Sequence, residues 1–303
     1  MDSKPVNLLD LGPNEFKKFM DSFDHVFSDC DGVIWEKQPL PQTGEFFSLM
    51  EKHGKTVNFV SNNSIRSRAN YEAMFKDAGI ENGFERLTTP SIAIAEYLKD
   101  HNGNKAVYCV TCPETVNVIE SYGITCKTGP DQASGFYDAF FSYLQDDPEI
   151  GAVAFDSDVR GNLAKIQKSI TILKRPEVLF VTGATDRYIY LKKGYKALGC
   201  AIFTDIVAEE SGRQPVILSK PSKHFGLFAM KRAGVTDPKR VLFIGDMIDQ
   251  DVGLGKATGF QTMMVLTNVP KETMMTHPTT RPDYYADSLA SIVPKLNEFK
   301  NKL

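Results

Sequence analysis

Two aspartates stand two positions apart at the end of an apolar run. The run His25–Ser28 reads as a buried strand and leads directly into Asp29, Cys30, Asp31 and Gly32. Where the chain leaves the regular pleat of a strand, side chains at i and i+2 can both point to one rim of a sheet. Glycine eases such a turn. Turns rich in Asp and Gly are common, so this pair on its own only suggests a site.

A second acidic cluster follows another apolar run. Val241–Ile244 is followed by Gly245 and then by Asp246, Asp249 and Asp251. Two carboxylates brought together at neutral pH repel each other unless a cation lies between them, and several hard oxygen ligands favour Mg²⁺. The alternative is a solvated acidic loop, which suits Asp249 better than Asp246, because Asp246 directly abuts the apolar run. The cluster therefore predicts a magnesium site that includes Asp246.

Groups that bind anions follow two more apolar runs. Ser61, Asn62 and Asn63 come directly after Thr56–Val60 and supply hydroxyl, amide and backbone N–H donors at a predicted helix N-terminus, which favours anions. Lys220 comes shortly after a short apolar run and supplies a positive charge. Carboxylates, Mg²⁺, a lysine and clustered donors together provide the charge neutralisation, the positioning and the nucleophile that phosphoryl transfer requires.

Strands and helices that alternate along the chain must position these groups. The segment from Ser64 to Gly79 places apolar residues at helical spacing and ends at a glycine, a common helix stop. A helical pattern closed by glycine and a β-branched residue recurs at Gly123 and Gly234. Such alternation predicts an α/β fold with a mainly parallel sheet. Because ligands bind at the carboxyl edge of such a sheet, we expect the four strand ends described above to meet at one edge.

Composition narrows the possible partners. The chain of 303 residues is long enough for two domains, or for one core with a large insertion. Its net charge of -3 is too balanced for a nucleic-acid or polybasic membrane footprint, and no apolar run reaches the ~18 residues that cross a membrane. Five scattered cysteines favour reduced thiols. We therefore expect a soluble, cytoplasmic protein whose partners are small molecules or proteins, with no nucleic acid and no membrane among them.

The combined motifs resemble the haloacid dehalogenase superfamily. That family carries a D-x-D motif after its first strand, Ser or Thr after the second, a later Lys and an acidic G-D-x4-D motif. Three longer stretches, DCDGVIW, VSNNSIRSRANY and SGRQPVILSKPS, are similar to the branch that contains p-nitrophenyl phosphatase, phosphoglycolate phosphatase and pyridoxal phosphatase. The resemblance spans nearly the whole chain. The matching residues, in the order of the family, are Asp29, Asp31, Ser61, Lys220, Asp246 and Asp251.

The resemblance implies a covalent mechanism. Asp29 would attack phosphorus to form an aspartyl phosphate, while Asp31 would protonate the leaving oxygen and then activate water. Two displacements, each flanked by a positioned acid or base, would replace one difficult displacement.

The resemblance also implies the ligands of the metal and of the phosphate. Mg²⁺ would be held by the Asp29 carboxylate, the Asp31 main-chain carbonyl and Asp246, with Asp251 at or just behind the coordination sphere. The residues expected to bind phosphate are Ser61, Asn62, Asn63 and Lys220.

The architecture of the family implies three segments. Residues 1–90 and 213–303 would form a Rossmann-like core with a parallel sheet, and residues 91–212 would form an inserted α/β cap of the C2 type. Within the cap, Asp156–Asn162 and Thr182–Asp186 depart from the patterns FD-x-HFSY-x-KL and TN-x-D of the relatives. We therefore expect the core chemistry to be kept and the substrate preference to differ. Related caps pair into homodimers, so the resemblance also implies a homodimer through the cap.

Two other functions fit parts of the pattern. A receiver-type signalling domain also combines clustered Asp, a hydroxyl and Lys, but it needs only one compact domain, and a stable phospho-aspartate should lack an acid–base group such as Asp31 nearby. A catalytically weak or inactive binding or regulatory protein with a diverged cap is the second alternative, against which the intact core motifs argue. The predicted function is a Mg²⁺-dependent phosphatase of small phosphate monoesters, of the p-nitrophenyl phosphate, phosphoglycolate or pyridoxal phosphate class.

Overall fold

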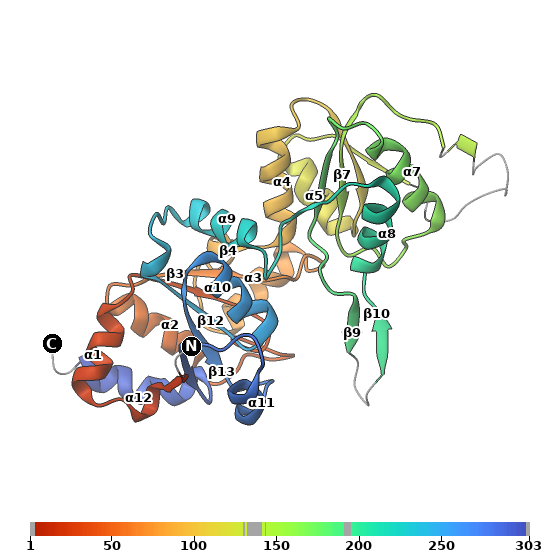
Figure 1. The fold of residues 1–303 in the computed structure, drawn as a ribbon. Helices are drawn as coiled ribbons and strands as arrows, with labels where there is room; N and C mark the ends of the chain where they lie inside the picture. The colour runs from red at the N-terminus through yellow and green to blue at the C-terminus, as the bar shows by residue number, and fades with distance from the viewer. Residues whose placement is uncertain (1–3, 130, 132–140, 143, 191–194, 301–303) are drawn as a thin grey trace. The chain divides into compact units, whose positions relative to one another are not determined.

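Two compact units make up the protein (Figure 1). A computed structural model describes residues 4–129, 131, 141–142, 144–190 and 195–300. The first unit comprises Met1–Ser61, Ser67–Thr88 and Lys220–Leu303, and the second comprises Asn62–Arg66 and Thr89–Ser219. Each unit has a parallel sheet of its own, which confirms the predicted α/β core with an inserted α/β domain. The cap boundaries at residues 91 and 212 stay a prediction.

The first unit is built on a seven-stranded parallel sheet. In spatial order its strands are β1 (Val6–Asn7), β14 (Tyr284–Ala286), β13 (Gln261–Val265), β12 (Val241–Gly245), β2 (His25–Ser28), β3 (Thr56–Val60) and β4 (Leu87–Thr88). Strand β2 is central, since His25 pairs with Val241 of β12 on one side and with Thr56 of β3 on the other. The chain thus joins segments far apart in the sequence at the middle of the sheet.

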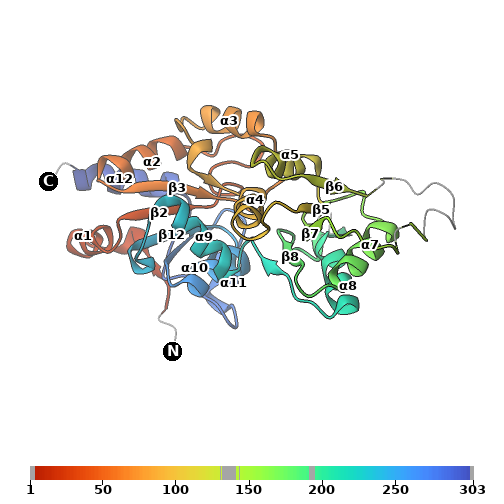
Figure 2. The same cartoon turned by 90° about the horizontal axis from the view of Figure 1, so that it is seen from above.

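Helices pack on both faces of this sheet, as Figure 2 shows for α2 and α12 on one face and α9 and α10 on the other. The helices of the unit are α1 (Pro13–Asp21), α2 (Thr43–Lys52), α3 (Arg68–Asp77), α9 (Lys223–Ala233), α10 (Gly253–Thr258), α11 (Lys271–Thr276) and α12 (Leu289–Lys300). Short turns of 3₁₀ helix are η1 (Leu8–Asp10), η2 (Phe84–Arg86) and η4 (Pro238–Arg240), and η5 (Ile248–Val252) is a π-helical turn.

Aromatic side chains fill the core beneath the α2 face. The ring centroid of Phe59 on β3 lies 5.3 Å from that of Phe47 on α2 and 4.8 Å from that of Phe75 on α3. All three side chains are buried. Rings packed at such distances stabilise the fold beyond the area they bury, so these contacts hold β3 against α2 and α3.

The second unit has a five-stranded parallel sheet in the order β11 (Val216–Ile217), β8 (Leu179–Thr182), β7 (Ile150–Phe155), β5 (Ala106–Val110) and β6 (Cys126–Thr128). A separate antiparallel pair is formed by β9 (Tyr188–Tyr190) and β10 (Lys196–Leu198). Its helices are α4 (Pro90–His101), α5 (Pro113–Ser121), α7 (Leu163–Leu173) and α8 (Ala201–Ser211). Every residue of the central strand β7 is buried, which is typical of a parallel sheet covered on both faces. No helix within the described ranges is both long and apolar enough to cross a membrane.

One strand belongs to a different sheet from the one predicted. The apolar run that precedes Lys220 forms β11, which pairs with β8 in the sheet of the second unit. Only three of the four strand ends therefore share the edge of the core sheet, and Lys220, which follows β11 in the chain, is the residue at which the first unit resumes.

The helix predicted to begin beside Ser61 also begins elsewhere. Helix α3 starts at Arg68, and Ser67 caps it by accepting a hydrogen bond from the Asn70 N–H at 3.3 Å. The chain between Ser61 and Ser67 is irregular. Serine favours the cap position, because its hydroxyl satisfies an N–H that has no partner within the helix. Ser61, Asn62 and Asn63 are thus not at a helix N-terminus, and the structure contradicts that prediction.

Candidate active site

Three strands of the core sheet deliver polar residues to one edge. Asp29 directly follows β2, Ser61 follows β3 and Asp246 follows β12. The register pairs Ser28 with both Phe59 and Ile244, and the Asp29 N–H donates to the Ile244 carbonyl at 2.8 Å. The ends of the three strands are therefore level with each other, as expected for the carboxyl edge of a parallel sheet.

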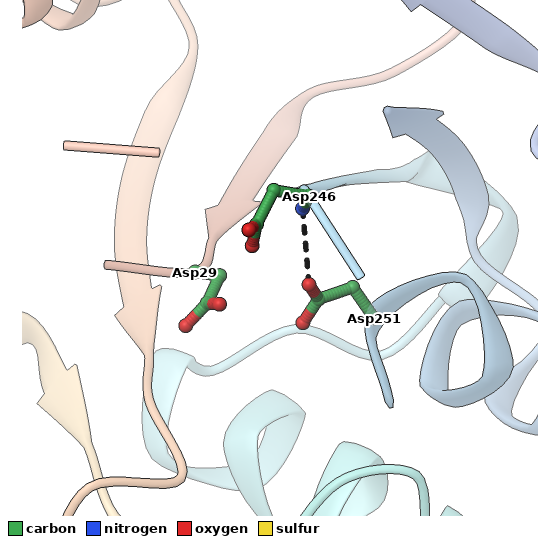
Figure 3. A group of neighbouring side chains, drawn as sticks. All are labelled: Asp29, Asp246 and Asp251. Atoms are coloured by element: carbon green, nitrogen blue, oxygen red, sulfur yellow. Dashed lines mark hydrogen bonds between the residues drawn. The ribbon is translucent and has the colours of Figure 1, made fainter. Parts of the chain in front are cut away.

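Three buried carboxylates meet at this edge (Figure 3). One carboxylate oxygen from each of Asp29, Asp246 and Asp251 lies within 4.8 Å of the other two. The exposed fractions of these residues are only 6%, 1% and 1%. Acidic groups so deeply buried are rare unless a cation or a hydrogen-bond network compensates them.

A single buried lysine pairs with two of the carboxylates. Lys220 is 2% exposed, and its Nζ lies 2.8 Å from Asp29 Oδ1 and 2.7 Å from Asp251 Oδ1. Burial lowers the pKa of Lys220, but Asp251 and Asp29 outweigh burial and raise it above its usual value. Lys220 therefore stays charged, and the cluster carries a net charge of -2 when all three carboxylates are ionised.

This excess of negative charge shifts the pKa values of two aspartates. Burial raises the pKa of Asp29 well above its usual range, with Asp251 and Asp246 adding to the rise and Lys220 opposing it. Burial and the charge of Asp251 raise the pKa of Asp246 to about 7, although Asn268 and Lys220 lower it. A bound divalent cation would neutralise the remaining charge and keep these carboxylates ionised.

Asp251 is held by hydrogen bonds on both of its oxygens. Its Oδ2 accepts hydrogen bonds from the backbone N–H groups of Asp246 at 3.0 Å and Met247 at 2.9 Å, while its Oδ1 is bound to Lys220. The π-helical turn η5 brings the side chain back towards the end of β12. Both oxygens of Asp251 are therefore occupied in holding the loop and Lys220. Asp29 and Asp246 are the better candidates for direct metal ligands.

Asp246 offers an oxygen that needs a partner. Its Oδ2 accepts a hydrogen bond from the Asn268 amide at 2.5 Å, whereas its buried Oδ1 has no hydrogen-bond partner among the described residues. A buried acceptor without a partner is costly. Hard oxygen donors around a net negative charge suit a divalent cation, so the residues of this edge fit a divalent metal site.

Comparisons with known families agree with this geometry. The family model for haloacid dehalogenase-like hydrolases matches residues 26–125, and a second model, described as HAD-hydrolase-like, matches residues 217–292. Together the matches cover more than half of the chain and include all of the clustered residues. The chain belongs to the haloacid dehalogenase-like hydrolases.

Relatives of this haloacid dehalogenase-like hydrolase align along almost its whole length. Phosphoglycolate phosphatase 2 of Arabidopsis thaliana is 28% identical, over 93% of this chain and 96% of its own. The glycerol-3-phosphate phosphatase of Rattus norvegicus is 26% identical, over 96% of each chain. The structure of the p-nitrophenyl phosphatase from Archaeoglobus fulgidus superposes with a TM-score of 0.76 at 26% identity, over 90% of this chain and 99% of its own. The protein is therefore a phosphoric monoester hydrolase of this C2-capped branch, acting on small phosphate monoesters.

The other residues predicted for the site of this hydrolase are Asp31, Ser61, Asn62 and Asn63, and their surroundings differ from one another. Asp31 is half-buried and lies outside the group of three carboxylates that the described residues form. Ser61 is buried, and its Oγ accepts a hydrogen bond from the Tyr71 hydroxyl at 3.4 Å. Asn62 and Asn63 belong to the second unit, where Asn63 accepts a hydrogen bond from the Ile65 N–H at 3.2 Å. Asn63 thus stabilises its own turn.

The sequence pattern of this hydrolase does not single out Asn268. The residue has no acidic or basic group and belongs to no recognised spacing. A signal was nevertheless present, because Asn268 comes shortly after β13, whose carboxyl end lies at the same edge as that of β12. The rule that led to Asp29 and Asp246 would also have led to Asn268.

The cap stretches that depart from the relatives make contacts within the second unit of the hydrolase. Asp158 is buried and pairs with buried Lys165 at 2.8 Å. Asp156 accepts a hydrogen bond from Thr115 at 3.0 Å, and burial raises the pKa of its carboxyl. Asn162 caps α7 by accepting from the Lys165 N–H at 3.1 Å. These residues stabilise the fold of the second unit.

Proposed function

We propose that the enzyme is a Mg²⁺-dependent phosphatase that transfers the phosphoryl group of a small monoester first to Asp29 and then to water. The observation that carries this proposal is the buried cluster of Asp29, Asp246 and Asp251 around Lys220. Such a cluster supplies a nucleophile, a cation site and a fixed positive charge within one edge of the sheet, which phosphoryl transfer requires.

Asp29 is the nucleophile. Its Oδ1 accepts hydrogen bonds from the Cys30 N–H at 2.7 Å and from Lys220, whereas its Oδ2 accepts none from the described residues. The carboxylate is therefore oriented through one oxygen, and the other is available for the attack on phosphorus. The bond from phosphorus to the leaving oxygen breaks as the bond to Asp29 forms.

Asp31 is the acid and the base. In the first step it gives its proton to the leaving oxygen, and in the second it takes a proton from the water that attacks the phosphorus of the aspartyl phosphate. Asp29 is released with both of its oxygens, so both residues end in their starting states. Asp31 is only half-buried, so the residue is partly in contact with solvent.

Mg²⁺ would be held by Asp29, the Asp31 main-chain carbonyl and Asp246, and it would neutralise charge on the phosphoryl oxygens. Ser61 and Lys220 bind the phosphate from the edge of the sheet. Support for a small substrate comes from relatives named as phosphoglycolate, glycerol-3-phosphate and 4-nitrophenyl phosphatases. The substrate is thus a compact phosphate monoester of this class. A cytoplasmic location and a homodimer through the cap stay predictions.

The decisive experiment is a measurement of phosphate release with and without Mg²⁺. The panel is phosphoglycolate, glycerol phosphate, pyridoxal phosphate, sugar phosphates and p-nitrophenyl phosphate. We expect turnover that requires Mg²⁺, and peptide mapping after an acid quench should locate the phosphoryl group on Asp29. Substrate binding without turnover, at any metal concentration, would instead support the inactive binding protein with a diverged cap.

A further inference from the structure

Asn268 contacts the cluster but has no part in the chemistry described above. It lies in the turn after β13 and is exposed to solvent, whereas Asp246 is 1% exposed. Its side-chain amide nevertheless reaches Asp246 and donates to Oδ2 at 2.5 Å. An exposed residue thus makes a short hydrogen bond to a carboxylate that is almost completely buried.

The turn that carries Asn268 is fixed on two sides. The Leu266 N–H donates to the Ala286 carbonyl at 3.1 Å, which continues the pairing of β13 with β14. On the other side, the Thr267 hydroxyl donates to the Gly32 carbonyl at 2.6 Å. Asn268 is therefore held at a fixed distance from the D-x-D loop, which comprises Asp29–Gly32.

The pair formed by Asn268 and Asp246 packs directly against Gly32. The φ angle of Gly32 is +79°, in the left-handed region, and a Cβ at this position would collide with Asp246 Oδ2 and Asn268 Nδ2. The missing side chain of Gly32 creates the space in which amide and carboxylate meet. Three segments, the D-x-D loop, the end of β12 and the turn after β13, thus determine where the Asp246 carboxylate lies.

The two oxygens of Asp246 have opposite roles in this arrangement. Oδ2 is occupied by Asn268, and buried Oδ1 has no hydrogen-bond partner in the described parts of the chain. A carboxylate that is held through one oxygen cannot rotate freely. The other oxygen is therefore presented in one direction, as a metal ligand requires.

We propose that Asn268 is a positioning residue that holds Oδ2 of Asp246 so that Oδ1 is presented to a divalent cation. This inference rests on the proposed function, since it assigns the cation to the same site. An amide suits the task because it donates a hydrogen bond without adding positive charge, which a lysine here would add in competition with the cation. Partners that orient metal ligands typically contribute about 10- to 100-fold to metal affinity.

Calorimetric titration of the full-length protein with Mg²⁺, at fixed pH and without substrate, tests the proposal. The variants are Asn268→Ala and Asn268→Leu, of which the second keeps the bulk of the side chain and loses the donor. Asn297→Ala is the matched control, because Asn297 bonds only weakly, at 3.5 Å, to exposed Glu45. We expect both Asn268 variants to bind Mg²⁺ about tenfold more weakly than the wild type, and the control to bind equally well.

The unfolding temperature without metal separates positioning from a structural role. Positioning predicts that Asn268→Leu keeps the unfolding temperature of the wild type in the absence of Mg²⁺ while its Mg²⁺ affinity falls. Wild-type affinity in Asn268→Leu would overturn the inference, whether or not the unfolding temperature changes. If the wild type itself bound no Mg²⁺, the proposed function would fail first, and this inference with it.

Discussion

Lys220 Nζ lies 2.8 Å from Asp29 Oδ1, and both side chains are almost completely buried. The lysine is shared, because Asp251 binds the same ammonium at 2.7 Å. One positive charge therefore balances only part of the cluster, and the Asp29 carboxylate is oriented by the first residue of the chain after the second unit ends at Ser219.

Replacing Asp29, the proposed nucleophile, should abolish turnover. In Asp29→Asn the amide oxygen is a poor nucleophile, so we expect hydrolysis of p-nitrophenyl phosphate to fall by about a thousandfold or more. Asp249→Asn is the matched control, because the Asp249 side chain is 82% exposed and lies in the same acidic loop as Asp246. Steady-state rates at saturating Mg²⁺ measure the difference. Near wild-type turnover in Asp29→Asn would contradict the covalent mechanism.

Asp31→Asn should affect substrates according to their leaving groups. Nitrophenolate leaves readily without a proton, whereas an alkoxide needs the acid. We therefore expect this variant to lose more activity with glycerol phosphate than with p-nitrophenyl phosphate, and to accumulate phosphorylated Asp29 because water is no longer activated. Glu36→Gln, an exposed acid of the same loop, serves as control. Equal losses on both substrates would argue against the acid–base role.

Lys220→Met should destabilise the protein. It leaves buried carboxylates without their cation, and breaking a buried ion pair from one side costs about 3–5 kcal/mol. Urea unfolding at neutral pH measures this loss, which Mg²⁺ should partly restore. Lys223→Met, at an exposed position of α9, should unfold like the wild type. A Lys220→Met protein as stable as the wild type would show that the carboxylates are compensated by other groups.

The metal-free protein should lose stability as the pH rises towards 7. The pKa of Asp246 is raised to about 7 from the 3.8 of an unperturbed aspartate. The folded state thus binds this proton more tightly than the unfolded state does. The stabilisation is complete below pH 4 and is lost as the pH rises through 7, by about 4 kcal/mol for a shift of this size.

The free energy of unfolding, measured between pH 5 and pH 8 without metal, tests this pH dependence. The difference between wild type and Asp246→Asn reports the titration of Asp246 together with its electrostatic effect on Asp29. We expect the variant to be relatively more stable at pH 8 than at pH 5. Mg²⁺ should stabilise the wild type most at the higher pH, where Asp246 is ionised. An unchanged difference across this range would mean that Asp246 titrates at an ordinary pKa.

Much of the core could be predicted because its signals are local. Apolar runs that end in Asp29, Ser61 and Asp246 are strands β2, β3 and β12, and their polar ends share one edge as parallel strands require. The run before Lys220 has the same local pattern but belongs to the other sheet. An apolar run predicts a buried strand, but it does not specify which sheet that strand joins.

The burial of Lys220 and the role of Asn268 depend on contacts between distant segments. Spacing suggested a lysine at the rim, but two carboxylates from separate loops enclose it. The resemblance places Asp251 near the metal. Its spacing from Asp246 does not show that a π-helical turn directs the side chain to Lys220 and to two backbone N–H groups. Asn268 lacked any motif, so only the three-dimensional register of β12 and β13 identifies it.

The pairing of Val241 with His25 affects how the chain can fold during its synthesis on the ribosome. Strand β2 lies between β3 and β12, and β12 is translated only after the whole inserted unit. Until then, one side of β2 has unpaired backbone groups and apolar side chains that can attract other nascent chains. The inserted unit has its own sheet and can form first. The core sheet should therefore remain open to such contacts until β12, β13 and β14 have emerged.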